Sequence, residues 1–474
     1  MSRGIWEWSA TRMAEAIASR EVSARDVVAA CLDRVSEVNT ALNAVTVDLS
    51  ASARIAADNA DAAVARGDVL PPLHGVPITI KENVDQAGCA TTHGVVAFRD
   101  LVASEDSPVV ANFRAAGAVI IGRTNTPAFS LRLDTDNDLR GRTWNPWSRD
   151  HTPGGSSGGA ASSVAAGITP IGHGNDIAGS VRYPAYACGL VGLRPSFGRV
   201  PAHNPSAAGE RSLSAQIFSV QGPLARNVAD VALALGAMSL GDVRDPWWVP
   251  APLTGAPPRE PIQVAVVTEP EDLAGARLHP TVADALSRAA DSLADAGYEI
   301  VDARTPGFTR AMELWFAMQM PELQTLLQPT IEKFGDDGIR RAMHLMLEVY
   351  PVAEGLGYMT ALAERARVVR EWNCFLEQVP LVLAPVCSEP VYKRGFDLES
   401  RERTAGLWRE CVTLTAVPVL GLPALAVPTG VVDGLPTGVQ ILAARFREDL
   451  CVAAGAAIEA RAGVTAMLPI DPAW

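Results

Sequence analysis

Gly75-Val76-Pro77-Ile78-Thr79-Ile80-Lys81 is a run of mostly β-branched residues that ends in a lysine. Such a run favours a short strand directed into the interior, where a cation at its end would lose its water. Only three of the 40 basic residues are lysines. A buried lysine can give up its proton and act as a base, whereas arginine cannot. Lys81 is therefore a candidate catalytic base, and the alternative is a lysine that ends an exposed edge strand.

Strand and helix patterns alternate on both sides of this run. Residues 109–116 predict a helix, residues 117–122 a short buried strand, and residues 160–166 a helix of small side chains that must pack closely against a neighbour. A strand, a helix and a strand are expected again at Ile262–Val267, His279–Ala296 and Tyr298–Val301. This alternation is typical of an α/β protein.

The first 65 residues have a helical pattern, with Ser23 and Asp26 as an N-cap pair. The Pro-rich stretch Asp245–Pro261 predicts a surface connection, more in keeping with a tether across one domain than with a domain boundary.

The composition indicates a globular protein whose partner is a small molecule. The 474 residues are 48% hydrophobic and 20% charged, enough for one large or two ordinary domains. A net charge of −13 argues against nucleic acid and anionic membranes as partners. Seven scattered cysteines favour neither a disulfide framework nor a zinc site. Without a signal peptide or membrane-span pattern, the expected location is the cytoplasm.

A second chemical signal is Gly154-Gly-Ser-Ser-Gly-Gly159, which directly precedes the small-residue helix. A phosphate loop would carry a lysine after the glycines, where Ala160 and Ala161 stand instead. A nucleophile elbow with Ser156 or Ser157 would need a hydrophobic strand before it, and residues 147–153 do not supply one.

A third signal is His173-Gly-Asn-Asp-Ile-Ala-Gly-Ser-Val-Arg-Tyr-Pro184, a turn that presents Ser180 and free backbone amides. Those amides could bind an oxyanion. Asp176 and Arg182 flank the turn, and a partly buried ion pair between them would fix its shape. Taken alone, Ser180 could equally be a turn serine bonded to its own backbone.

The order and spacing of these three signals resemble the amidase signature family. Lys81 lies 99 residues before Ser180, and Ser156 lies 24 before it. Matching segments cover most of the chain: His74–Lys81, Gly122–Pro127, Asn145–Trp147, the two serine segments, Cys188–Pro195, Gln221–Arg226, Leu383–Pro385, Gly421–Pro428 and Gly434–Gln440. Two departures are Ala178, where a glycine is usual, and Ala128, where an acidic residue is common; the first is expected to affect the oxyanion turn and the second the substrate entrance.

The resemblance implies a single α/β/α sandwich, residues 1–474, in which a central mixed twisted β-sheet is flanked by helices. Within it we expect an N-terminal helical segment (1–65), a catalytic core (75–230) and a variable helical pocket region (300–375).

The resemblance also implies a Ser-cisSer-Lys triad of Ser180, Ser156 and Lys81, with a cis Gly155–Ser156 bond and no metal or cofactor. Neutral Lys81 would take a proton from Ser156, which takes one from the nucleophile Ser180. The backbone N–H groups of Ile177, Ala178, Gly179 and Ser180 would form the oxyanion hole, and Gly155, Ser157, Asp176 and Arg182 would support the site.

The sequence defines the substrate less closely. Six of the ten methionines fall between Met312 and Met359, near Trp315, which suits an apolar funnel and suits a helical core equally well. Ser130, Leu131, Trp315 and Met318 are the candidate pocket residues. Aryl amides, anilides, carbamates (urethanes), nylon-type oligoamides and short esters are the candidate substrates.

Two other functions remain open. One is a glutaminase-type subunit of a tRNA-dependent amidotransferase, and the other is a non-catalytic binding protein on the same fold. The presence of Lys81, Ser156 and Ser180 argues against the second. The expected assembly is a monomer or a homodimer.

Overall fold

The β-branched run forms strand β2 (Pro77–Lys81), which lies inside an eleven-stranded sheet in the computed structural model of the chain. The structure describes residues 4–352 and 355–463. All five residues of β2 are buried. Parallel strands β3 (Val119–Thr124) and β4 (Ile171–Asp176) pair with its two edges. The predicted inward strand is confirmed, and the alternative of an exposed edge strand is wrong.

The strands lie in the order β1-β3-β2-β4-β6-β5-β10-β11-β9-β7-β8. Strand pairs around β2 and β7 are parallel and the others are antiparallel, so the sheet is mixed, as expected. The remaining strands are β1 (Val45–Asp48), β5 (Val191–Arg194), β6 (Val220–Ala225), β7 (Gln263–Val266), β8 (Glu299–Val301), β9 (Leu381–Pro385), β10 (Ala424–Val432) and β11 (Leu435–Ala443).

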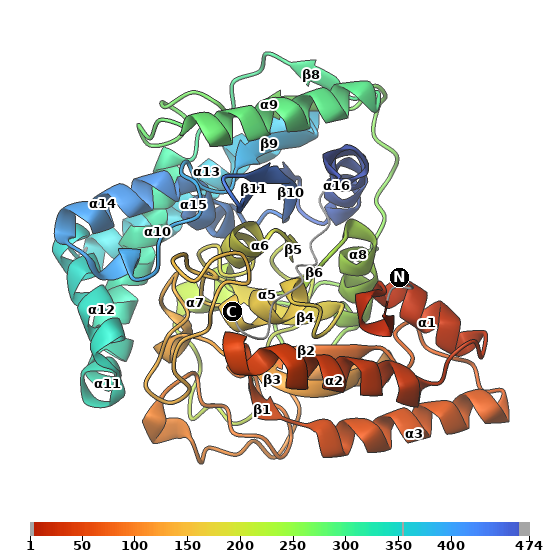
Figure 1. Cartoon of the computed structure of the whole chain (residues 1–474). Coiled ribbons are helices and arrows are strands. Elements are labelled where there is room, and N and C mark those ends of the chain that lie inside the picture. The colour runs from red at the N-terminus through yellow and green to blue at the C-terminus, as the bar shows by residue number, and fades with distance from the viewer. Residues whose placement is uncertain (1–3, 353–354, 464–474) are drawn as a thin grey trace.

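Helices cover both faces of this sheet (Figure 1). Leu381 and Leu383 of β9 pack in one hydrophobic cluster, whereas Val382 and Ala384 pack in another, because successive strand residues point to opposite faces. The predicted α/β/α sandwich is confirmed.

The first cluster is formed with α1 (Ala10–Ala18), α2 (Ala24–Leu42), α3 (Ser50–Arg66), α4 (Pro108–Ala115), α8 (Val228–Met238), α9 (Pro280–Asp295) and α16 (Glu448–Ala462). The second is formed with α5 (Gly158–Ala165), α6 (Arg182–Cys188), α7 (Leu213–Phe218), α10 (Thr309–Glu322), α11 (Gln328–Phe334), α12 (Asp337–Val349), α13 (Gly355–Gln378), α14 (Arg401–Glu410) and α15 (Val412–Leu420).

The helices and strands expected from the sequence are present in the structure, together with one strand in the N-terminal segment that was not expected. Ser23 caps α2, and Ser23 and Asp26 form a reciprocal capping box. The N-terminal segment also contains strand β1, which pairs antiparallel with β3 and was not anticipated. No helix or strand lies between Asp245 and Pro261. The division of the chain into the three expected regions stays a prediction.

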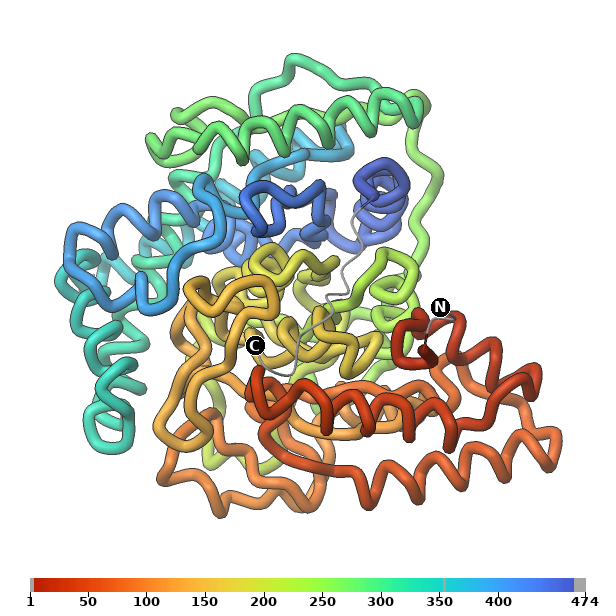
Figure 2. Tube along the Cα trace, viewed as in Figure 1, coloured from red at the N-terminus to blue at the C-terminus, as the bar shows by residue number. Residues whose placement is uncertain are grey.

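Helices α11 and α12 lie at the lower left of the molecule, below α14 (Figure 1), and are drawn in teal in Figure 2. Helix α10 leads into a π-helical turn at Leu323–Leu327 before α11 begins. It also packs against α15 and α13. Among the helices of the described residues, none has the length and apolar character that crossing a membrane requires.

Candidate active site

The carboxyl ends of β2 and β4 bring the predicted catalytic residues together. Lys81 is the last residue of β2, and Asn175 and Asp176 end β4. These strands are parallel neighbours, so their ends lie at the same edge of the sheet. Ser156 and Ser157 stand directly before α5, and the Gly155–Ser156 bond is cis. The three segments singled out in the sequence therefore meet at one place.

Lys81 is completely buried and surrounded by oxygen atoms. Its Nζ lies 2.8 Å from Ser156 Oγ, 3.1 Å from Ser157 Oγ and 2.8 Å from Asn175 Oδ1. Burial lowers the pKa of Lys81 well below 10.5, and the Asp176 carboxylate opposes this shift only in part. The environment therefore favours the uncharged amine.

Counting protons shows what an uncharged Lys81 does with its three neighbours. A neutral amine has two N–H donors and one lone pair. Asn175 Oδ1 can only accept. Ser157 Oγ lies 3.4 Å from the Asn175 carbonyl oxygen, to which it donates, so it accepts from Lys81. The lone pair is left for the hydroxyl of Ser156, which is the geometry required of a base.

Two asparagines hold this arrangement and were not identified from the sequence as site residues. Asn175 Nδ2 donates to Asn83 Oδ1 at 2.9 Å, which directs Asn175 Oδ1 toward Lys81. Asn83 Nδ2 in turn donates to Ser130 Oγ at 3.0 Å. The only local signal for them is their position, since Asn83 lies two residues after Lys81 and Asn175 precedes Asp176.

A buried ion cluster fixes the turn that carries Ser180. Asp176 Oδ2 lies 3.0 Å from Arg182 Nε, and Asp176 Oδ1 lies 3.6 Å from Arg194 Nη1. Burial alone would raise the pKa of Asp176, but Arg182 and Arg194 outweigh it and lower the pKa to about 2. The expected Asp176–Arg182 pair is present, and Arg194 is a partner that the sequence reasoning missed.

Ser180 is nearly buried, with 5% of its surface exposed, and it lines a pocket. Among the residues that the structure describes, its hydroxyl makes no hydrogen bond. The link from Ser156 to Ser180 is therefore not closed by a hydrogen bond here. Catalytic hydrogen bonds in ligand-free enzymes are often long and tighten when substrate binds.

The expected oxyanion hole needs one correction. The Gly179 N–H donates to Asp176 Oδ1 at 2.8 Å, so this amide is already occupied. The N–H groups of Ile177, Ala178 and Ser180 donate to no other group in the described part of the chain. Gly179 has φ +93°, and a Cβ there would lie 2.7 Å from Leu414, so glycine is required for the shape of the turn. Three amides, not four, are open to an oxyanion.

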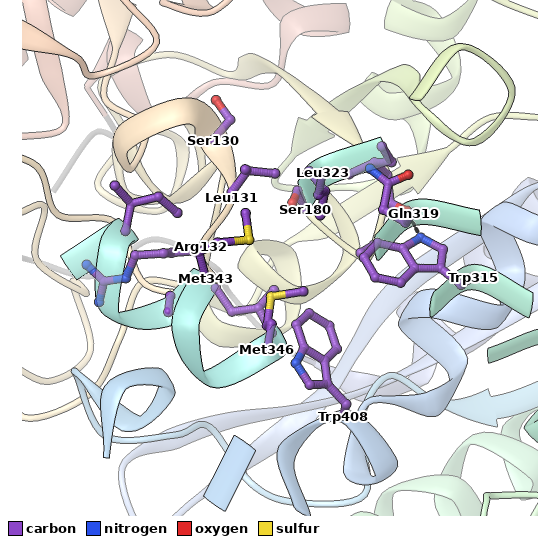
Figure 3. Close-up of a pocket in the computed structure, with 15 residues that line it drawn as sticks. Ser130, Leu131, Arg132, Ser180, Trp315, Gln319, Leu323, Met343, Met346 and Trp408 are labelled. Atoms are coloured by element: carbon purple, nitrogen blue, oxygen red, sulfur yellow. Dashed lines mark hydrogen bonds between the residues drawn. The ribbon is translucent and has the colours of Figure 1, made fainter. Parts of the chain in front are cut away.

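An apolar pocket opens on Ser180 between α10, α12 and α14 (Figure 3). Its free volume is small, about 30 Å³, so an aromatic substrate enters only by displacing side chains of the wall. The rings of Trp315 and Trp408 lie near-parallel, 24° apart with centroids 6.0 Å from each other. Trp315 Nε1 donates to the Ile177 carbonyl at 3.0 Å, which ties the pocket wall to the oxyanion turn.

Three of the four side chains expected in the pocket lie there, namely Ser130, Leu131 and Trp315. The assignment of Met318 is wrong: it is completely buried in the hydrophobic core and does not line the pocket. From the methionine-rich segment, Met343 and Met346 contribute to the wall instead. The full lining is Ser130, Leu131, Arg132, Leu133, Ile177, Ala178, Ser180, Trp315, Gln319, Leu323, Ile339, Ala342, Met343, Met346 and Trp408.

The one cationic side chain at the pocket is already paired. Arg132 Nε and Nη2 donate to the two oxygens of Asp397, each at 3.0 Å. Within residues 4–352 and 355–463, no group of His, Cys, Asp and Glu is arranged to hold a metal ion.

Comparison with known proteins identifies the family of the chain. The sequence model of the amidase family matches residues 26–452. The chain belongs to the amidase family. An indoleacetamide hydrolase of Bradyrhizobium diazoefficiens is 47% identical to this amidase over 98% of the chain and 88% of the relative. The chain is a hydrolase acting on carbon–nitrogen bonds of linear amides.

Two further relatives are named for other reactions. A glutamyl-tRNA(Gln) amidotransferase subunit of Deinococcus radiodurans is 31% identical to this amidase over 98% of the chain and 99% of the relative. A solved 6-aminohexanoate cyclic dimer hydrolase, in complex with its substrate, superposes with a TM-score of 0.83 at 28% identity and covers 98% of this chain and 99% of its own.

Proposed function

We propose that this amidase hydrolyses the primary amide of an arylacetamide such as indole-3-acetamide, releasing ammonia and the carboxylic acid. The observation that carries the proposal is the narrow apolar pocket at Ser180, walled by Trp315, Trp408, Met343 and Met346. Trp315 and Trp408 pack against each other with centroids 6.0 Å apart, so an aromatic ring of the substrate would lie against their exposed edges and the adaptable side chains of Met343 and Met346. The 47% identity to an indoleacetamide hydrolase supports the same substrate class.

The proposed chemistry begins with the proton arrangement around Lys81. Neutral Lys81 takes the proton of Ser156, and Ser156 takes the proton of Ser180. Ser180 Oγ then attacks the amide carbon. Ser156 returns its proton to the amide nitrogen, which leaves as ammonia and generates an acyl-enzyme on Ser180. A water molecule, deprotonated through the same relay, releases the acid and restores the Ser180 hydroxyl.

The tetrahedral oxyanion is held by backbone amides that are in place before the reaction. The free N–H groups of Ile177, Ala178 and Ser180 are the proposed donors. A preorganised donor of this kind contributes on the order of 3 kcal/mol to the transition state. Asp176, Arg182 and Arg194 hold the turn in shape without contacting the substrate.

A glutaminase function is less consistent with the pocket. Glutamine carries an ammonium and a carboxylate, and each needs a charged or strongly polar partner. The pocket wall is mostly apolar, and its one cation, Arg132, is neutralised by Asp397. The similarity to the amidotransferase subunit therefore supports amide hydrolysis by this chain and does not support glutamine as its substrate.

The proposal is tested by assaying the purified chain alone with indole-3-acetamide, phenylacetamide, acetamide and glutamine. We expect kcat/KM to be highest for indole-3-acetamide and lowest for glutamine, without ATP or a partner protein. A strong preference for glutamine, or for acetamide, would overturn the substrate assignment.

We also propose a cytoplasmic enzyme that acts as a monomer or homodimer without nucleic acid. Seven free cysteines, five of them buried, are in keeping with a reducing compartment.

A further inference from the structure

Gln319 is a polar side chain in the wall of the apolar pocket that the proposed mechanism does not use. It lies one helical turn after Trp315 on α10, so both side chains reach the same face, as Figure 3 shows. Only 3% of its surface is exposed. One end of its amide contacts Ser214 of α7, and the other end has no hydrogen-bond partner in the described part of the chain.

The orientation of this amide follows from the single proton of the Ser214 hydroxyl. Ser214 Oγ lies 2.5 Å from the near end of the Gln319 amide and is also in hydrogen-bond contact with the Glu322 carboxylate. A hydroxyl donates one hydrogen bond and accepts the others. Ser214 therefore cannot donate to both neighbours.

The Ser214 hydroxyl donates its hydrogen bond to the Glu322 carboxylate. This carboxylate also accepts from the Ser214 backbone N–H at 3.0 Å and from the Tyr358 hydroxyl at 2.6 Å. Burial and the hydrogen bond to Glu322 raise the pKa of Tyr358 to about 12, so this hydroxyl stays protonated and donates a hydrogen bond to Glu322. A carboxylate can only accept hydrogen bonds, so the hydrogen atom of the Ser214 hydroxyl points at Glu322.

The near end of the Gln319 amide must then be the NH₂ group, donating to Ser214 Oγ. The oxygen and nitrogen ends of an amide have nearly the same shape, and the hydrogen-bond partners decide which is which. The structure draws the oxygen 2.5 Å from Ser214 Oγ, and we exchange the two ends of the amide, which leaves the carbonyl oxygen of Gln319 as the end without a partner. The pocket then contains a fixed acceptor in apolar surroundings.

We infer that Gln319 is a specificity residue that accepts a hydrogen bond from an N–H group on the aromatic part of the substrate. This inference rests on the proposed arylacetamide function and adds to it a required donor on the ring. An indole supplies that donor. An isosteric ring with oxygen in place of the N–H leaves the buried Gln319 oxygen unpaired and loses affinity in the transition state.

The test compares indole-3-acetamide with benzofuran-3-acetamide, whose ring oxygen replaces the N–H, in the wild type and in Gln319→Met. We expect the wild-type kcat/KM to favour the indole by about 10- to 100-fold. Gln319→Met keeps the length of the side chain and removes the acceptor, so the ratio should fall to within about threefold. The matched control is Leu323→Met, which alters the same wall without changing a hydrogen bond and should keep the wild-type ratio.

Three outcomes would overturn the inference. They are equal rates on the two rings in the wild type, a ratio that survives in Gln319→Met, and a preference for the benzofuran, which would mean that the amide nitrogen faces the pocket. In each of these the proposed function stands, because an arylacetamide is hydrolysed. If neither amide is hydrolysed the proposed function fails. In that case indole-3-acetic acid and benzofuran-3-acetic acid are compared for their ability to protect Ser180 from a fluorophosphonate. If the two acids protect equally well, in the wild type and in Gln319→Met, the assignment of Gln319 is overturned as well.

Discussion

The strand-edge site around Lys81 and the helical wall of the pocket are built on different principles. Lys81, Ser157 and Asn175 contact one another through hydrogen bonds, and Asp176 beside them forms ion pairs with Arg182 and Arg194. The wall that includes Trp315, Met343, Met346 and Trp408 is apolar and comes from three separate helices.

This difference separates chemistry from selectivity. A polar network of fixed distances leaves little freedom for substitution, because each removed group leaves a buried partner unsatisfied. An apolar wall can change shape at modest cost, particularly where it contains methionine. We therefore expect changes at the strand edge to affect every substrate equally and changes in the wall to alter the order of substrates.

The largest effect is expected for Lys81→Arg. Arginine keeps the positive charge but cannot lose its proton, so the relay through Ser156 has no base. We expect kcat/KM to fall by several orders of magnitude, on the order of 10³ or more, for all amides alike. Fluorophosphonate labelling and amide hydrolysis measure this loss. An arginine variant with a tenth of wild-type activity would show that Lys81 is not the base.

The next effect is on stability, for Asp176→Asn. Removing this carboxylate leaves Arg182 and Arg194 buried without their anion, which costs about 3 to 5 kcal/mol. Chemical denaturation should show a lower midpoint with an unchanged slope. Asp58→Asn is the matched control, because it breaks the exposed pair with Arg25 and should change the midpoint little. Equal shifts in the two variants would contradict the importance of the buried cluster.

Two methionines of the same segment should behave differently. Met318→Ala opens a cavity in the core and should cost about 2 to 5 kcal/mol of stability without changing the order of substrates. Met346→Ala removes part of the pocket wall and should change the ratio of aryl to short aliphatic amides by roughly 10-fold or more. A change of ratio in Met318→Ala, with none in Met346→Ala, would reverse the assignment of core and wall.

The smallest effect is the pH dependence contributed by Lys81. Its pKa in the folded chain lies well below 10.5, so between that value and 10.5 the unfolded chain binds a proton that the folded chain does not. Stability from this group is therefore lost as pH falls through that window, by at most about 1.4 kcal/mol per pH unit. Activity should rise with pH through the same lowered pKa, because only the neutral amine is a base. In Lys81→Met the free energy of unfolding should no longer fall with pH through this window. An unchanged dependence of the unfolding free energy on pH would show that Lys81 does not contribute it.

The sequence predicted the strand edge well because its signals are local. The β-branched run that ends in Lys81 and the short spacing between Asp176 and Arg182 are both visible within a few residues. Arg194 was missed because only the pairing of β4, β6 and β5 brings it to Asp176.

The pocket wall was harder to predict. Trp408 lies far along the chain from Trp315, and only packing brings the two rings together. Met318 was misassigned because composition shows that a segment is apolar and does not show which face of its helix meets the ligand. The face of α10 and of the following turn that meets the pocket carries Trp315, Gln319 and Leu323. These residues are spaced four apart, so they lie on one side of the helix.

In the proposed mechanism Ser180 forms the acyl-enzyme at the strand edge, and the pocket wall selects the aromatic ring. The most direct measurement is mass spectrometry of the chain, quenched during turnover of indole-3-acetamide or labelled with a fluorophosphonate, followed by peptide mapping. We expect an indoleacetyl or phosphonyl adduct on Ser180 in the wild type, and none in Ser180→Ala. An adduct on Ser156 or Ser157, or turnover retained by Ser180→Ala, would contradict it.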